Sequence, residues 1–545
     1  MTSPAWASSE RVLLHGGTIY SPVSPFATAM LIDGDRIAWL GEDSAAQAHR
    51  DSAHRTVDLR GALVTPGFVD AHVHATSTGL MLTGLDLTQA TSLAHMLALL
   101  EARARELHGA TIIGHGWDET RWPEGRPPTR VEIDRASWGS VAYLSRVDVH
   151  SAAVSSALVA MVPGVQGLAG FDPSGPVSQQ AHHAVRDYIL GGIDAPQRQA
   201  AHTVMRTHAA SLGIVAMHEM AGPTISSEAD LRDLLMTAAA VSGPLVTGYW
   251  GELASSGGIE RARDLGAYGV AGDLFVDGAI GSRTACMCAP YADDQATNGA
   301  RYLTADDVSA HVVAATQAGL QAGFHVIGDS AAASVFDGFR AAERQLGTSA
   351  LRMRGHRLEH AECLSDSDIT AMADLGISAS MQPMFDGLWG GPGGMYEQRL
   401  GADRARVMNR FADLVGAGVL VAFGSDAPVT EVGPWQAVRA AVHHGTPEQS
   451  LSARAAFSAH TRGGWRAVGE HAAGVLAPDA PAHLAFWESS EVTVQAADSR
   501  VAAWSTDPRS GTPGLPALHA DAPLPRCLRT VVAGTVIFDS GDLEP

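Results

Sequence analysis

The stretch VTPGFVDAHVHA, residues 64–75, places polar side chains at the end of an apolar run. Alternate residues of a β-strand point to the same face, so Asp70, His72 and His74 share one side of the chain. Two imidazoles on one face, at the carboxyl end of a barrel strand, can hold a divalent cation. Because a His-x-His pair also arises by chance in a chain with 24 histidines, it needs support from other strands.

Three later strand-like runs also lead into a polar residue. QAGFHV carries His325, GHRLEH closes on His360, and VLVAFGS is followed by Asp426. Each residue stands between an apolar run and an expected loop or helix, which is where barrel enzymes keep catalytic groups. One such residue alone would favour a buried structural role, but four strand ends in this order favour a common metal site.

Strand-like and helix-like segments alternate through the middle of the chain. Apolar runs of strand length recur at 64–74, 111–117, 213–218, 245–250, 273–277, 321–327, 357–360, 377–382 and 419–425. Helical spacing occurs at 227–241, 305–318, 330–346 and 403–417. This alternation predicts an α/β fold with a (β/α)₈ barrel over residues 64–474.

Two segments interrupt the alternation. Residues 119–200 are expected to form an insertion over the barrel mouth. Residues 381–400 contain Trp-Gly-Gly-Pro-Gly-Gly at 389–394 and are expected to form either a mobile lid or a surface loop.

Both ends of the chain are typical of short strands joined by tight turns. The first contains AMLIDGDRIAWLGE with an Asp-Gly hairpin signal, and the last contains AHLAFWES, VAAWST and RTVVAGTVIFD. We therefore predict one small composite β domain built from residues 1–63 and 475–545.

The charge and composition exclude several classes of protein. A net charge of −21 argues against nucleic acid or an anionic membrane as a partner, because both need clustered cations. The sequence offers no membrane-spanning run and no recognisable signal peptide, and its four cysteines suit a reducing compartment. We expect a cytoplasmic protein that acts on a small molecule, and a homodimer is left open.

Lysine is absent from the sequence, and all 37 basic residues are arginine. This bias is typical of a GC-rich bacterial genome. Its chemical consequence is that a Schiff-base lysine, a lysine general base and a carboxylated lysine are all excluded.

Six segments resemble the signatures of amidohydrolase family 3, in the branch that includes the N-substituted formamide deformylases. They are VTPGFVDAHVHA, FVDGAIGSRTA, FHVIGDSA, HRLEHAE, SMQPMF and FGSDAP, within a match from about Val12 to Phe538. The resemblance implies a (β/α)₈ TIM-like barrel with a small β-sandwich made from both ends. It also implies hydrolysis of an amide or related C–N bond by a metal-activated water. The metal-site residues implied by motif position are His72, His74, His325, His360 and Asp426.

One position departs from the family pattern. Members with two metals carry a carboxylated lysine that bridges both ions, and Asp273 occupies its position here. Because aspartate is shorter, we expect Asp273 not to span two ions. Glu219 is an alternative bridge and His218 an alternative ligand, each against an ordinary supporting role.

We therefore expect one divalent ion, with zinc as the metal and Fe²⁺ or Mn²⁺ left open. Its ligands would be His72, His74, His325 and Asp426, or His360 in place of one of them. Two ions, without a carboxylated lysine, remain an alternative.

The expected chemistry follows from this site. The cation would lower the pKa of bound water from about 16 to roughly 7. Asp426 would pass the proton of that water to the leaving nitrogen. His360 would bind a second metal or stabilise the hydroxide and the oxyanion, and Asp277 would orient a ligand.

Four further residues are expected to contact the substrate: Trp117, His150, Arg283 and Gln382. For Arg283, a structural ion pair is the alternative. Structural or surface positions are expected for His115, His443 and His444.

Two other functions remain open. The same kind of site would support a mononuclear deaminase that releases ammonia from a heterocycle. A barrel that binds small molecules without turnover is the alternative from another class.

Overall fold

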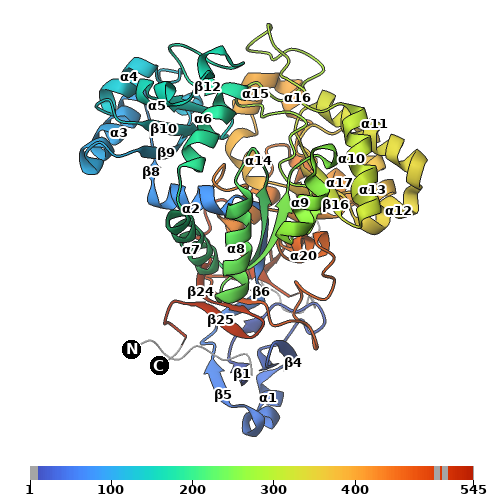
Figure 1. Ribbon diagram of the computed structural model, residues 1–545. Helices are drawn as coiled ribbons and strands as arrows, with labels where there is room; N and C mark the ends of the chain where they lie inside the picture. The colour runs from blue at the N-terminus through green and yellow to red at the C-terminus, as the bar shows by residue number, and fades with distance from the viewer. Residues whose placement is uncertain (1–9, 496–503, 506–512, 544–545) are drawn as a thin grey trace.

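Eight parallel strands follow one another around the centre of the molecule (Figure 1). The structure is a computed structural model and describes residues 10–495, 504–505 and 513–543. A parallel bridge between Val73 and Ala427 brings the last strand's end to the first strand, so the sheet nearly closes. The predicted (β/α)₈ class is confirmed. The strands are β7 (Phe68–Val73), β13 (Ile214–Ala221), β14 (Leu245–Trp250), β15 (Gly269–Val270), β16 (Gln321–Val326), β17 (Arg357–His360), β18 (Ser378–Met381) and β19 (Val421–Phe423).

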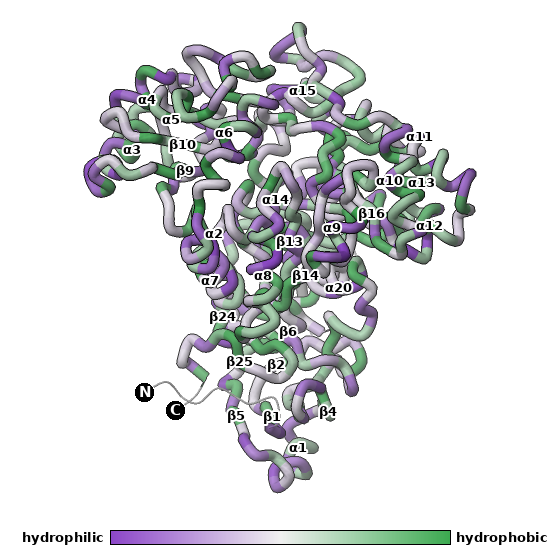
Figure 2. The backbone as a smooth tube through the Cα atoms, in the orientation of Figure 1, coloured by the Kyte–Doolittle hydropathy of each residue, from purple (hydrophilic) through white to green (hydrophobic). Residues whose placement is uncertain are grey.

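Helices cover the outside of the barrel and leave its strands buried. The strands β7 and β13 are buried along their whole length, whereas Figure 2 shows many hydrophilic residues along α7 (Ala195–Ser211). The predicted helices at 227–241, 305–318 and 330–346 are confirmed as α8 (Glu228–Ala240), α10 (Ala305–Ala318) and α11 (Asp329–Leu346). Among the described residues, no helix has both the length and the hydropathy needed to cross a bilayer.

The helix predicted at 403–417 is divided into α16 (Ala402–Ala405) and α17 (Phe411–Gly416). Asn409 lies between them with a φ of 50°, outside the right-handed helical region. A regular helix cannot pass through that residue.

Two predicted barrel strands are placed differently. The run at 111–117 is β9 (Ile112–Trp117), which pairs in a separate sheet. The run at 273–277 is irregular, because the barrel strand ends at Val270 and Gly272 has a φ of 90°. Only Phe275 forms a bridge there, to His325. An apolar run of strand length does not indicate which sheet it joins.

A five-stranded mixed sheet forms a lobe beside the barrel mouth, drawn blue to teal at the upper left of Figure 1. We call residues 85–191 the cap. Its strands are β8 (Leu85–Asp86), β9, β10 (Ala142–Arg146), β11 (Ser151–Val154) and β12 (Val177–Ser178). Its helices are α3 (Leu93–Leu107), α4 (Arg130–Ala136), α5 (Ser156–Met161) and α6 (Gln179–Gly191). The cap sheet begins at Leu85, before the insertion predicted at 119–200. It includes β9, the run at 111–117 that was predicted as a barrel strand.

The two ends of the chain meet in one five-stranded sheet on the opposite side of the barrel (Figure 1). It joins β2 (Thr18–Ile19) and β6 (Leu63–Pro66) to β20 (Leu484–Glu488), β24 (Arg526–Val532) and β25 (Thr535–Asp539). A four-stranded sheet packs beside it, made of β1 (Arg11–His15), β3 (Ala29–Asp33), β4 (Arg36–Gly41) and β5 (Arg55–Asp58). The domain limits 1–63 and 475–545 stay a prediction, and the run VAAWST lies largely outside the described residues.

Residues 381–400 fold into α14 (Pro383–Trp389) and α15 (Met395–Leu400). Phe385, Trp389, Met395 and Tyr396 are buried in one apolar cluster. The segment is therefore packed against the molecule, and its movement as a lid stays a prediction.

Candidate metal centre

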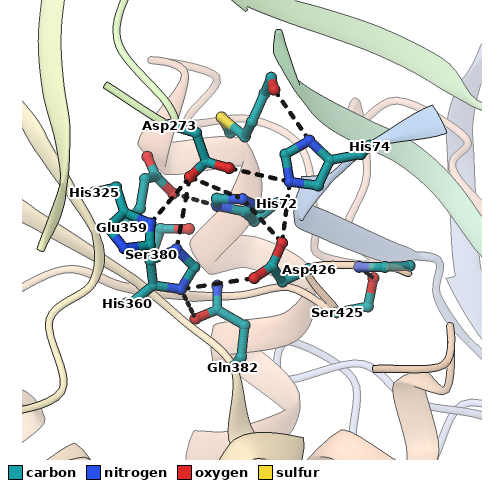
Figure 3. A network of polar contacts seen from close by, with 12 residues as sticks. His72, His74, Asp273, His325, Glu359, His360, Ser380, Gln382, Ser425 and Asp426 are labelled. Atoms are coloured by element: carbon teal, nitrogen blue, oxygen red, sulfur yellow. Dashed lines mark hydrogen bonds and ion pairs between the residues drawn. The ribbon is translucent and has the colours of Figure 1, made fainter. Parts of the chain in front are cut away.

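Buried polar side chains converge at the carboxyl end of the barrel (Figure 3). His72 and His74 extend from β7, and Asp426 follows β19. Together with Asp273, which follows β15, each offers one ligand atom, and these atoms lie within 4.8 Å of one another. Two imidazoles and two carboxylates form a donor set that suits Zn²⁺ and related cations.

Asp273 also belongs to a second group, with His325 of β16 and His360 of β17. Its Oδ2 lies 3.1 Å from His74 Nε2. Its Oδ1 lies 3.4 Å from His325 Nδ1 and 3.6 Å from His360 Nε2. The two carboxylate oxygens therefore face different histidines.

This geometry bears on two expectations, and both stay predictions. The predicted four-ligand set contained His325, whereas the structure groups Asp273 with His72, His74 and Asp426 and places His325 in the second group. Asp273 was also expected to be too short to reach two ions. The barrel strand ends at Val270 and the chain turns at Gly272, so Asp273 does not occupy a regular strand position.

Three of the histidines have Nδ1 held by an acceptor, which directs Nε2 towards the carboxylates. His72 Nδ1 lies 2.9 Å from Glu359 Oε2, and His74 Nδ1 lies 3.1 Å from the Met220 carbonyl oxygen. His360 Nδ1 lies 2.8 Å from Gln382 Oε1. Such contacts fix the tautomer and the orientation of metal-binding histidines.

His325 has the opposite orientation, because its Nε2 lies 3.2 Å from the Gly278 carbonyl oxygen and its Nδ1 faces Asp273. Within the described residues, the Nε2 atoms of His72 and His360 are buried and form no hydrogen bond, although carboxylate oxygens lie 3.3 Å and 3.6 Å from them. Buried polar atoms without a partner are rare. A divalent cation would supply the missing partner, so the residues present fit a metal.

The histidines and carboxylates of the metal centre shift one another's pKa values. Burial lowers the pKa of His74, but Asp273 and Asp426 outweigh it and raise that pKa to about 9. Burial raises the pKa of Asp426, yet His72 and His74 bring it well below its usual range. Without a cation, His72 and His74 favour their protonated forms beside the carboxylates. Metal binding must therefore release protons, which makes affinity pH-dependent.

Sequence reasoning missed the buried pair Arg357 and Glu359. Both side chains are fully buried. Arg357 Nε donates to Glu359 Oε1 at 2.5 Å, while Glu359 Oε2 faces His72. The available signal was the run HRLEH, in which two charges alternate within a buried strand. Glu359 therefore orients His72, one of the potential metal ligands.

Glu359→Gln is expected to weaken metal affinity by about 10- to 100-fold, the usual cost of altering a residue that orients a ligand. Competition with a chromophoric chelator measures this change. Asp230→Asn is the matched control, because Asp230 is a buried carboxylate that contacts Thr76 and His202 instead of a ligand. Equal affinities for the two variants would contradict the role of Glu359.

The other residues considered as ligands lie outside both groups. Glu219 accepts a hydrogen bond from the Ala75 amide at 2.8 Å, and burial raises its pKa to about 7. His218 lies beside Arg357, and burial lowers its pKa to about 3. Asp277 accepts hydrogen bonds from the Ile327 and Gly328 amides, which shape the loop after His325.

A cavity extends from the metal centre to the cap. His150, expected to contact substrate, lines it, with its ring centroid 5.6 Å from that of His325. His115 was expected to be structural, but it also lines this cavity. Gln382 does not line it and instead holds His360.

The structure does not bring Trp117 or Arg283 to this cavity. Trp117 packs within the cap and donates to the Leu144 carbonyl at 2.7 Å. Arg283 pairs with Asp293 at 2.8 Å, which is the structural alternative to a substrate contact. Asp293 also binds Arg399, which reaches Glu119 of the cap. Arg283 is thus part of an ion network that extends to the cap.

The fold and the site together define a hydrolase built on a metal-binding barrel. A model of the amidohydrolase family matches residues 55–538, so the chain belongs to the amidohydrolase family. Membership makes it a metal-dependent hydrolase, and the specific resemblance to family 3 is confirmed.

Three proteins illustrate the similarity. The putative amidohydrolase YtcJ of Bacillus subtilis (strain 168) is 27% identical over 465 residues, covering 79% of this chain and 83% of YtcJ. The N-substituted formamide deformylase of Arthrobacter pascens is 24% identical over 477 residues, covering 80% of this chain and 85% of the deformylase. An uncharacterized metal-dependent hydrolase from Pyrococcus furiosus has a crystal structure that matches with a TM-score of 0.68 at 25% identity. That match covers 87% of this chain and 98% of the hydrolase.

Proposed function

We propose that the protein hydrolyses a non-peptide C–N bond of the amide, N-formyl or cyclic amide type. The observation that carries this proposal is the group His72, His74, Asp273 and Asp426 beside a cavity at the barrel mouth. Active sites of such barrels lie at this end. The similarity to an N-substituted formamide deformylase supports the choice of bond.

We propose zinc as the metal, because imidazole and carboxylate ligands suit it. A bound zinc ion would lower the pKa of a water molecule to roughly 7 and supply hydroxide at neutral pH. The sequence favours one ion. However, Asp273 belongs both to the group with His72 and His74 and to the group with His325 and His360. We therefore favour two ions, for which Asp273 would be a shared ligand. Elemental analysis of metal per chain distinguishes one ion from two.

Asp426 is our proposed proton carrier. Its carboxylate lines the cavity, and Oδ1 lies 3.1 Å from His74 Nε2. A carboxylate at this position can accept a proton from the attacking water and deliver it to the leaving nitrogen. Gln382 holds His360, and His150 lines the cavity wall, where we propose that it contacts the substrate.

Removal of the metal by a chelator is expected to abolish hydrolysis, and added Zn²⁺ is expected to restore it. The measurement follows release of carboxylate and amine from a panel of N-formyl, N-acyl and cyclic amides. Ammonia release from heterocycles would instead support a deaminase. Tight binding of these amides by metal-replete protein without turnover would support a binding barrel.

A further inference from the structure

Arg186 is the one arginine among the described residues that line the cavity beside the metal centre. Arg186 extends from α6 of the cap, and Leu190, one helical turn later, lines the same cavity. Residues four apart share one helix face, so this face of α6 forms part of the cavity wall. His115 and His150 also line the wall, but burial lowers their pKa to about 4 and about 3, which leaves them neutral at pH 7.

The guanidinium of Arg186 has no carboxylate partner among the described residues. Its Nη2 donates to the Thr224 carbonyl, but no carboxylate oxygen of the described residues lies within 4.0 Å. Its Nε is buried and has no acceptor in the described part of the chain. By contrast, the buried Arg146 and Arg399 each bind carboxylates. In a protein with a net charge of −21, an arginine without such a partner beside the active site is conspicuous.

The rest of the wall is largely apolar. Leu80, Met81, Ile113 and Phe275 line the cavity together with Leu190. A ligand that fills it must therefore combine an apolar body with a group that satisfies a guanidinium. Carboxylates match the fork of N–H donors on arginine and bind it through charge-assisted hydrogen bonds.

We propose that Arg186 recognises a carboxylate on the substrate, so that the enzyme acts on N-acylated amino acids with apolar side chains. This inference rests on the proposed hydrolysis of amides. The carboxylate bound by Arg186 is separate from the amide that is cleaved at the metal centre. The hydrogen bond to Thr224 holds the guanidinium against the barrel and orients it for binding.

The proposal is tested with matched substrates, N-acetyl- and N-formyl-leucine and their carboxamides, on the zinc-loaded enzyme. The wild type is expected to prefer each carboxylate by about 10- to 100-fold in kcat/KM, the range for a hydrogen bond to a charged group. Arg186→Gln is expected to remove this preference by raising KM for the carboxylates. The kcat/KM values for the carboxamides should stay within about threefold of those of the wild type. Arg186→Lys should retain part of the preference.

Arg198→Gln is the matched control, because Arg198 lines a neighbouring cavity and is paired with Asp233. It removes the same formal charge and should preserve the preference for carboxylates. If Arg186 only ties the cap to the barrel, Arg186→Gln will lower activity on both members of each pair equally. That result, or a wild type without preference, overturns the proposal.

A binding measurement separates this inference from the proposed reaction. N-methanesulfonyl-leucine and its carboxamide, in which a sulfonyl group replaces the hydrolysable N-acyl group, are titrated calorimetrically into the zinc-loaded protein. Tighter binding of the carboxylate that disappears in Arg186→Gln supports the role of Arg186 even if no amide is cleaved. Equal binding of both compounds to the wild type overturns it, whatever the reaction.

Discussion

Replacement of Asp426 by asparagine is expected to lower kcat by about 10²- to 10⁴-fold, the range contributed by a positioned acid–base group. Asparagine has nearly the same shape but cannot accept the proton of an attacking water. Asp426 follows β19, and its carboxylate faces His72 and His74 at the cavity. The rate is measured on metal-loaded protein, with metal content determined for each preparation.

Asp386→Asn provides the control for loss of a buried carboxylate, because Asp386 accepts a hydrogen bond from the Gly445 amide and does not line the cavity. Its kcat is expected to stay close to that of the wild type. An Asp426→Asn variant that retains both metal and wild-type kcat would remove Asp426 from the proton transfer.

Replacement of Arg357 by methionine is expected to lower the free energy of unfolding by about 3–5 kcal/mol, because a buried charge then loses its partner. Glu359 is fully buried and accepts two hydrogen bonds from Arg357, at 2.5 and 2.9 Å. Arg357 also donates to the Ala71 carbonyl at 2.8 Å, which joins β17 to β7. Urea unfolding of the metal-free protein measures the loss without a contribution from metal binding.

The double variant Arg357→Met/Glu359→Leu tests the cause. It removes both charges and is expected to recover part of the lost stability, because apolar residues can replace a buried ion pair at little cost. A single variant as stable as the wild type, or a double variant that is less stable than the single one, would contradict this explanation.

Much of the centre could be predicted from local patterns. His72, His74, His325, His360 and Asp426 each stand at or directly after the end of a buried run. Parallel strands of a barrel all end on one face, so residues at these positions must come close together. The spacing of apolar residues thus predicted both the barrel and the five side chains.

Other features depended on contacts between distant parts of the chain. The run at 111–117 has the composition of a barrel strand, but β9 pairs with β8 and β10 in the cap. Glu359 supports His72 across 287 residues of sequence. Arg186 stands out only because, among the described residues, no carboxylate oxygen lies within 4.0 Å of its guanidinium in the folded cavity. Strand pairing and side-chain contacts between distant segments cannot be inferred from the residues that adjoin each segment in the sequence.

By itself, the sequence determined the class of fold and the absence of a carboxylated lysine, and it predicted the histidine and aspartate ligands. Those properties follow from residue identity and from the strand period, which are local. Only the tertiary structure decided that Asp273 takes part in both ligand groups. That outcome depends on where β15 ends, on the turn at Gly272, and on the histidines that three other strands bring to its two oxygens.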